Sequence, residues 1–212
     1  GVMYSWLEGE EIGDEPTLDQ LHTVGRAMAL LHENSSHFTL TDGAELPTFN
    51  DFFWGTEDYL FSGKSTLIPK DRQLIEQARD LIMMFTDELY ATSVVHIIHA
   101  DLHGWNLMWH EDQLSIFDFD DCGYGVEAQD IAVALYYLDT PEQDAALLDG
   151  YKSIRPLPLY SEKAMKALLL QRRLLLLNYL YETKNAEHKE MLPAYLEKTI
   201  ERVSTFLTDV TQ

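Results

Sequence analysis

Four polar side chains near the middle of the chain have the types needed for phosphoryl transfer to a hydroxyl group: Asp101, Asn106, Asp118 and Asp120. A carboxylate at Asp101 can orient an acceptor hydroxyl and take its proton. The amide oxygen of Asn106 and the carboxylate of Asp118 are hard ligands suited to Mg²⁺, which would bridge nucleotide phosphates. Asp120 either holds a second Mg²⁺ or is a solvated turn residue. The sequence therefore predicts a metal-dependent site for phosphoryl transfer.

Short apolar runs around these residues predict the elements that position them. The run at residues 94–98 predicts a buried strand that ends where the loop with Asp101 begins. Two further runs, at residues 107–109 and 114–117, lie on either side of a turn-like tetrapeptide and predict a hairpin. Such a hairpin would return Asp118 to the side of Asn106.

The stretch HADLHGWN at residues 99–106 resembles the catalytic loop His-x-Asp-x-x-x-x-Asn of protein kinases, and Asp118-Phe119-Asp120 stands where kinases carry Asp-Phe-Gly. It is still closer to the aminoglycoside phosphotransferase and choline kinase-like family, whose loops commonly read His-Gly-Asp-Leu-His-x-x-Asn. Ala100 replaces the Gly that is usual in that family. We expect this departure to be mild, because a methyl group matters only where the backbone needs a positive φ.

The resemblance implies a role for each residue of the motif. Asp101 would be the catalytic base, and Asn106 and Asp118 would be metal ligands for Mg²⁺, with ATP as the phosphate donor. Asp130 matches a buried Asp of the family that accepts hydrogen bonds from the backbone of the catalytic loop. His99 resembles the histidine that supports this loop, as opposed to one that carries a proton.

The first residues, 1–13, resemble the linker between the two lobes of a kinase, whose backbone hydrogen-bonds adenine. This resemblance would put the nucleotide beside four residues: Tyr4, Ser5, Trp6 and Leu7. Taken alone, the segment is equally typical of an edge strand and a turn. The chain has neither a Gly-rich phosphate loop nor a Val-Ala-Ile-Lys-like strand. We therefore expect residues 14–212 to be the C-terminal lobe of a longer protein, whose N-terminal nucleotide lobe is absent from this chain.

The remaining pattern predicts an α+β fold that is mainly α, a protein kinase-like C-terminal lobe with a short β-hairpin carrying the catalytic loop and the metal-binding Asp. A capping box at Thr17 and Gln20 predicts the start of a helix that ends near residues 34–36. Apolar residues at helical spacing predict five more helices, over residues 69–92, 126–138, 142–154, 161–184 and 192–210. A polar link is expected at residues 185–190.

Residues 40–67 have poor periodicity and many aromatic side chains, which predicts a loop-rich insert with short helices. Asp51, Trp54 and Asp58 could hold a cationic acceptor through ionic and cation–π contacts. Aromatic residues in such a loop more often anchor it to its domain.

The chain has 15 Lys and Arg against 36 Asp and Glu, a formal net charge of −21. This charge argues against a nucleic-acid partner or an anionic membrane surface, because both bind positive charge. It suits a cationic small acceptor, although solubility alone explains it as well. The single Cys122 excludes an intramolecular disulfide, and neither a signal peptide nor a transmembrane run is present in the sequence. We expect a cytoplasmic protein.

Three functions remain open. The leading hypothesis is an ATP-dependent phosphotransferase acting on a small molecule, for which aminoglycosides, choline or ethanolamine, homoserine and similar alcohols are all candidate acceptors. The second is a catalytically silent kinase-like binding module, since half of an ATP site is missing. The third is a zinc hydrolase, suggested by His96, His99, Asp101 and His103, although alternate strand residues point to opposite faces.

Overall fold

The computed structural model describes residues 6–211, which form two compact units. Unit 1 comprises the described residues up to Leu46 together with Val95–Pro158. Unit 2 comprises Pro47–Val94 and the described residues from Leu159 onward. The chain therefore passes repeatedly between the units, and the motif residues 99–130 all belong to unit 1.

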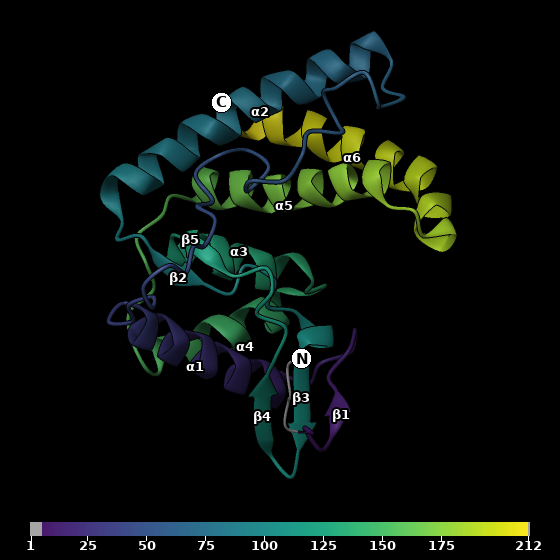
Figure 1. Cartoon of the computed structure of the whole chain (residues 1–212). Helices are drawn as coiled ribbons and strands as arrows, with labels where there is room; N and C mark the ends of the chain where they lie inside the picture. The colour runs from purple at the N-terminus through teal and green to yellow at the C-terminus, as the bar shows by residue number, and fades with distance from the viewer. Residues whose placement is uncertain (1–5, 212) are drawn as a thin grey trace. The chain divides into compact units, whose positions relative to one another are not determined.

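Unit 1 combines three helices with two small antiparallel sheets (Figure 1). The helices are α1 (Leu18–Ser35), α3 (Glu127–Tyr136) and α4 (Pro141–Lys152). The first sheet has the order β1-β3-β4, from β1 (Glu10–Glu11), β3 (Leu107–His110) and β4 (Gln113–Ile116). The second pairs β2 (His96–Ile98) with β5 (Gly123–Gly125), and a 3₁₀ turn, η1 (Gly104–Asn106), precedes β3.

Helices α1 and α4 pack closely because each has a glycine at the contact. A Cβ atom on Gly25 would lie 1.9 Å from the carbonyl oxygen of Leu147, and one on Gly150 would lie 2.0 Å from that of His22. The capping box that starts α1 is confirmed, since the Thr17 hydroxyl accepts the Gln20 N–H at 3.2 Å and the Gln20 side chain accepts the Thr17 N–H at 2.9 Å. These contacts fix α1 against the core of unit 1.

Strands β3 and β4 form the expected hairpin, with Leu107 opposite Ile116 and His110 opposite Gln113. The two residues of the turn, Glu111 and Asp112, have φ of 47° and 61°. Two positive φ values in a two-residue loop define a type I′ turn, in which Asn-Gly is favoured over Glu-Asp. The hairpin therefore forms in spite of strain at its tip.

We expect the double substitution Glu111→Asn, Asp112→Gly to raise the free energy of unfolding by about 1 kcal/mol, because it relieves this strain. Urea unfolding followed by circular dichroism measures the change. Glu45→Asn is a matched control, since Glu45 is exposed and is not among the residues with positive φ. An equal gain from the control would show that the turn is not the cause.

Unit 2 is built from α2 (Pro69–Thr92), α5 (Glu162–Glu182) and α6 (Ala186–Thr211), which pack on one another (Figure 1). Buried Arg173 joins α5 to α6: its Nε donates to the Thr199 hydroxyl at 2.9 Å, and its guanidinium lies 4.1 Å from the centre of the Tyr195 ring. Within residues 6–211, no helix combines the length and the apolar character that a membrane crossing requires.

The polar link expected at residues 185–190 is not present, because helix α6 already begins at Ala186. The Asn185 side chain accepts the Glu187 N–H at 2.9 Å and so caps the first turn. Pro193 lies inside the helix. A proline near the start of a long helix removes only one hydrogen bond, so the helix continues through it. The prediction was wrong because the polar residues 185–190 were interpreted as a link, whereas most of them form the first turns of the helix.

The segment between Pro47 and Ile68 also differs from expectation, since its described backbone contains no helix. Side chains satisfy its backbone instead: the side-chain Oδ1 of Asn178, from α5, accepts the N–H groups of Tyr59 and Leu60 at 2.8 and 3.0 Å. Phe49, Phe52 and Leu60 are buried. Aromatic residues that pack without helical spacing thus anchor this segment as an irregular loop.

Candidate active site

The loop after β2 is held by the buried carboxylate of Asp130, which comes from α3. One oxygen of Asp130 accepts the His99 N–H at 3.1 Å, and the other accepts the Ala100 N–H at 2.7 Å. Asp130 is 1% exposed. The structure therefore brings Asp130 to the backbone of the loop, which supports the predicted bracing role.

The expectation that Ala100 is a mild departure from glycine is wrong, because the φ of Ala100 is 66° and the residue is buried. The left-handed conformation costs a residue with a Cβ atom about 1 kcal/mol or more relative to glycine. Replacement of the usual Gly by Ala is therefore not a mild departure. The hydrogen bonds from the His99 and Ala100 N–H groups to Asp130 stabilise the strained turn that precedes Asp101.

We expect Ala100→Gly to change the free energy of unfolding by less than about 0.5 kcal/mol, because relief of strain offsets the lost methyl burial. Ala132→Gly is the matched control, since Ala132 is equally buried but lies within α3. The control should cost about 2 kcal/mol from lost burial and lower helix propensity. Equal losses in urea unfolding of the two variants would contradict the assignment of strain to Ala100.

His99 connects the loop to the chain that follows β4. Its Nε2 lies 3.1 Å from the carbonyl oxygen of Phe117, and its Nδ1 accepts the Asp101 N–H at 3.3 Å. These partners require the tautomer with hydrogen on Nε2. Both ring nitrogens of His99 are thus engaged within the site, and its role as a support of the loop stays a prediction.

The carboxylate of Asp101 has two polar side chains beside it. Asn106 Nδ2 donates to the Asp101 carbonyl oxygen at 2.8 Å and to its Oδ2 at 3.1 Å. His103 Nε2 lies 3.3 Å from the same Oδ2, while His103 Nδ1 accepts the Trp105 N–H. The Asp101 side chain is 18% exposed. It is therefore oriented from two sides and still accessible to a reactant.

His103 is a contact that our sequence reasoning assigned only to the zinc hypothesis. Its place two residues after Asp101, on the same loop, is a signal that could have identified it. Within residues 6–211 there is no group of three or more His, Cys, Asp or Glu side chains arranged to hold a metal ion. His96 contacts Glu127 and Ser35, so the three histidines of that hypothesis each have other partners.

The hairpin brings the segment that carries Asp118 back to Asn106, because the Phe117 N–H donates to the Asn106 carbonyl at 3.2 Å. Asp118 has a φ of 61° and is exposed. Asp118 and Asp120 line an open hollow of about 980 Å³. Its other lining residues are Trp6, Leu7, Gly9, Glu10, Glu11, Met108, Phe117 and Phe119. Carboxylates and apolar side chains thus face the same space.

The N-terminal segment is fixed to both the hairpin and the loop. Strand β1 pairs with β3, and the Gly13 N–H donates to the Gly104 carbonyl at 3.0 Å. A Cβ atom on Gly104 would lie 1.9 Å from the Gly13 oxygen, so only glycine fits there. The structure therefore places Trp6 and Leu7 at the hollow, whereas Tyr4 and Ser5 lie outside the described residues. Contact of these residues with a nucleotide stays a prediction.

His32 of α1 is a second residue whose contact with the loop support was not predicted from the sequence. It is 1% exposed, and its Nε2 lies 3.0 Å from Asp130 Oδ2. Burial alone would raise the pKa of Asp130, but the hydrogen bond and the charge of His32 outweigh burial and lower the pKa below its ordinary value. Asp130 is therefore an ionised acceptor for the loop.

This lowered pKa predicts a pH dependence of stability. A carboxyl group with a lower pKa in the folded state stabilises the protein above its unfolded pKa, and the contribution is lost as the pH falls through the folded pKa. Asp130→Asn should therefore flatten the fall in unfolding free energy on acidification below about pH 4. Asp144→Asn should have the opposite effect, because burial raises the pKa of Asp144. Urea unfolding between pH 7 and pH 3 tests both signs, and equal slopes in the two variants would contradict them.

The family model described as the phosphotransferase enzyme family matches residues 2–164. The chain belongs to this family. The match confirms the resemblance to aminoglycoside phosphotransferases and choline kinase-like proteins and spans the whole catalytic-loop region. It also covers α1, α3 and α4, which position the loop.

Two curated relatives in this family are kinases of small molecules. Amicoumacin kinase of Bacillus subtilis is 27% identical over 136 residues, which are 63% of this chain and 39% of the relative. Hydroxylysine kinase of Bos taurus is 27% identical over 197 residues, 80% of this chain and 50% of the relative. The chain thus spans about half, or less, of the length of these relatives.

Solved structures show the same fold. A microcompartment-associated aminopropanol kinase is 26% identical with a TM-score of 0.74, covering 91% of this chain and 63% of that one. Amicoumacin kinase hAmiN, in complex with AMP-PNP and Ca²⁺, is 22% identical with a TM-score of 0.68, covering 94% and 64%. The expected mainly helical α+β class, in a protein kinase-like fold, is confirmed.

The three acceptor candidates on the aromatic loop belong to unit 2. Asp51 accepts the N–H groups of Phe53 and Gly55 at 2.9 Å each, and Asp58 accepts that of Phe61 at 2.7 Å. The Trp54 ring packs against Phe49. Both carboxylates thus cap local turns, which favours the anchoring alternative, and binding of an acceptor stays a prediction.

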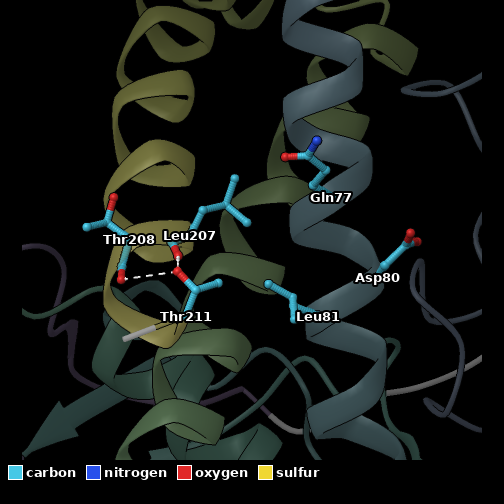
Figure 2. A pocket seen from close by; sticks show the side chains of 6 residues that line it. All are labelled: Gln77, Asp80, Leu81, Leu207, Thr208 and Thr211. Atoms are coloured by element: carbon cyan, nitrogen blue, oxygen red, sulfur yellow. Dashed lines mark hydrogen bonds between the residues drawn. The ribbon is translucent and has the colours of Figure 1, made fainter.

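A second hollow, whose volume is about 590 Å³, lies between α2 and α6 of unit 2. Figure 2 shows the side chains that line it. It is lined by Gln77, Asp80, Leu81, Leu207, Thr208 and Thr211. The Thr211 hydroxyl donates to the Leu207 carbonyl of its own helix, and Asp80 pairs with Arg79. These polar groups are used locally and do not converge on a common point, so the hollow lacks the features of a catalytic site.

Proposed function

We propose that the complete protein transfers the γ-phosphate of ATP to a hydroxyl group of a small molecule, and that this chain supplies the base and the metal ligands. The observation that carries the proposal is the placement of Asp101, oriented by Asn106 and His103 while still partly exposed, on the loop that the hairpin joins to Asp118. Family membership and kinases such as those named for amicoumacin and hydroxylysine support it.

Asp101 is the proposed base. A carboxylate held by a hydrogen bond from Asn106 and a contact with His103 has a fixed direction, so its remaining lone pairs can orient an acceptor hydroxyl and receive its proton. The net charge of −21 favours a cationic acceptor, such as an amino alcohol. Groups that surround the acceptor, not the loop itself, determine which acceptor is bound. The candidates are aminoglycosides, choline or ethanolamine, homoserine and similar molecules.

Asn106, Asp118 and Asp120 are the proposed metal ligands. Asn106 Nδ2 is committed to Asp101, which leaves its amide oxygen available to a cation. Both aspartates are exposed at the hollow. This all-oxygen set fits Mg²⁺, which, when bound, would neutralise the charge that develops on the nucleotide phosphates. A divalent ion accompanies AMP-PNP in the structure of one relative.

The hollow at Asp118 is the proposed nucleotide site. Apolar Trp6, Leu7 and Met108 suit an adenine ring, and the aspartates at its edge suit metal-bound phosphates. In this proposal residues 1–13 are the interlobe linker, residues 14–212 are the C-terminal lobe, and an N-terminal lobe of the complete protein covers the nucleotide. The closed hairpin β3–β4 would carry the metal-binding Asp.

Calorimetry of Mg²⁺-dependent ATP binding to the complete protein tests this assignment. We expect Asp118→Asn to weaken Mg²⁺-ATP binding about tenfold or more, because it removes one charged ligand. Asp112→Asn at the exposed tip of the hairpin is the matched control and should bind as the wild type does. Undiminished Mg²⁺-ATP binding by Asp118→Asn would remove Asp118 from the metal site. Tight ATP binding by a wild type that transfers no phosphate would instead support a silent binding module.

A further inference from the structure

Glu127, the first residue of α3, contacts three polar side chains. None of the roles assigned to the motif residues requires these contacts. Its Oε1 lies 3.1 Å from His96 Nε2 and 2.8 Å from a guanidinium nitrogen of Arg155. Its Oε2 accepts the hydroxyl of Tyr151 at 3.3 Å. The Glu127 side chain is 13% exposed. A carboxylate buried to this degree is stable only with such partners.

A chain of polar contacts leads from Glu127 to the catalytic loop. The Tyr151 hydroxyl, fully buried in α4, lies 2.9 Å from His32 Nδ1. His32 Nε2 lies 3.0 Å from Asp130 Oδ2, and Asp130 holds the N–H groups at the start of the loop. Residues from α1, α3 and α4 therefore meet behind the loop in one buried network.

Tyr151 and His32 join the carboxylates of Glu127 and Asp130 through successive polar contacts. Tyr151 has a single hydroxyl hydrogen, which it donates to Glu127, so its oxygen must accept from His32 Nδ1. His32 Nε2 faces the Asp130 carboxylate, which also accepts two backbone N–H groups. His32 thus bridges Tyr151 and Asp130.

The charges are consistent with this arrangement. Burial would raise the pKa of Glu127, but the hydrogen bond from His96 and the charges of His32 and Arg155 lower it below its ordinary value. Burial, followed by the charge of Glu127, raises the pKa of Tyr151, which keeps its hydroxyl protonated as a donor.

Glu127 also holds both ends of the stretch Val95–Pro158, through which unit 1 connects to unit 2. His96 follows directly after the chain enters this stretch, and Arg155 lies shortly before the chain leaves it. His96 is bound from its other side, because its Nδ1 lies 2.6 Å from the Ser35 hydroxyl. One side chain thus links these two segments to the residues that support Asp130.

We propose that Glu127 is a positioning residue for the catalytic loop. It acts through Tyr151 and His32 on Asp130, and so fixes the backbone turn at Ala100 that orients Asp101. Through its contacts with His96 and Arg155, Glu127 also connects these supporting residues to both ends of Val95–Pro158. Only the effect on catalysis rests on the proposed function; the effect on the loop backbone does not.

Hydrogen exchange of individual amides in the complete protein, measured by NMR, tests the proposal without an activity assay. In Glu127→Gln, protection of the His99 and Ala100 amides should fall about tenfold, since a charge-assisted contact that supports their acceptor is lost. The Val133 amide, in the core of α3, should keep its protection. Asp149→Asn, an exposed variant in α4, should change none of these amides.

Tyr151→Phe provides the second variant, because it deletes only the hydroxyl that links Glu127 to His32 and carries the test if Glu127→Gln does not fold. It should lower protection of the same two amides by several-fold, since one buried hydrogen bond is lost. Unchanged protection at His99 and Ala100 in either folded variant would overturn the proposal. Equal losses at Val133 would also overturn it, because they would indicate general destabilisation.

Steady-state kinetics gives the second readout. Glu127→Gln should lower kcat about tenfold while the KM for ATP changes less than about twofold, because the loop moves and the nucleotide hollow does not. If Glu127→Gln loses protection at the His99 and Ala100 amides but keeps the wild-type kcat, the proposed effect of Glu127 on catalysis is overturned. If the wild type transfers no phosphate, the proposed function fails, and the amide measurement still decides whether Glu127 positions the loop.

Discussion

Asp101→Asn in the complete protein is expected to lower kcat about 10³-fold, the loss typical when a general base is removed. The substitution keeps the size of the side chain, and an amide oxygen can still accept from Asn106 and His103. It removes the negative charge and the basic lone pair that would take the hydroxyl proton. The loop should therefore stay in place while the chemistry stops.

Binding of Mg²⁺-ATP should change less than about threefold in this variant, because Asp101 does not line the hollow at Asp118. Initial rates give kcat, and calorimetry gives the affinity. Asp139→Asn is the matched control, since Asp139 is exposed after α3 and should keep both parameters. A kcat within tenfold of the wild type would exclude Asp101 as the base.

Asp130→Ala is expected to lower the free energy of unfolding by about 3–4 kcal/mol, because it leaves several buried donors without an acceptor. These donors are the N–H groups of His99 and Ala100 and the Nε2 of His32. The turn at Ala100, whose φ is 66°, would lose the contacts that stabilise its strain. We therefore expect kcat to fall together with stability.

Asp130→Asn separates the two effects, since its amide oxygen can replace one of the two carboxylate acceptors. Its unfolding free energy should lie between those of the wild type and of Asp130→Ala in urea unfolding experiments. A loss below about 1 kcal/mol for Asp130→Ala would contradict the account, because exposed, unpaired aspartates produce effects of that size. It would mean that the loop has another source of support.

The helices were largely predictable because their signals are local. Apolar residues at helical spacing and Pro69 located α2 at residues 69–92, and the Thr17–Gln20 box located the start of α1. The hairpin before Asp118 could be predicted for a similar reason, since two apolar runs flank four turn residues. Where the apolar pattern was interrupted, by the polar residues 185–190 or by clustered aromatics, the predicted boundaries failed.

The support behind the loop could not be predicted from local pattern. His32 and Asp130 are 98 positions apart, and no spacing rule connects them before the fold brings α1 to α3. The positive φ of Ala100 could not be predicted from the residue itself, because alanine, unlike glycine, is not typical of this conformation. The motif residues Asp101, Asn106 and Asp118 were accessible to sequence reasoning only through their order and the resemblance.

The most direct test of phosphoryl transfer uses γ-labelled ATP, Mg²⁺ and the small-molecule fraction of an extract from the source organism. The account predicts that the wild-type complete protein forms a labelled small molecule, that chelation of Mg²⁺ abolishes the product, and that Asp101→Asn forms none. A wild type that binds Mg²⁺-ATP but forms no more labelled product than Asp101→Asn would contradict the account.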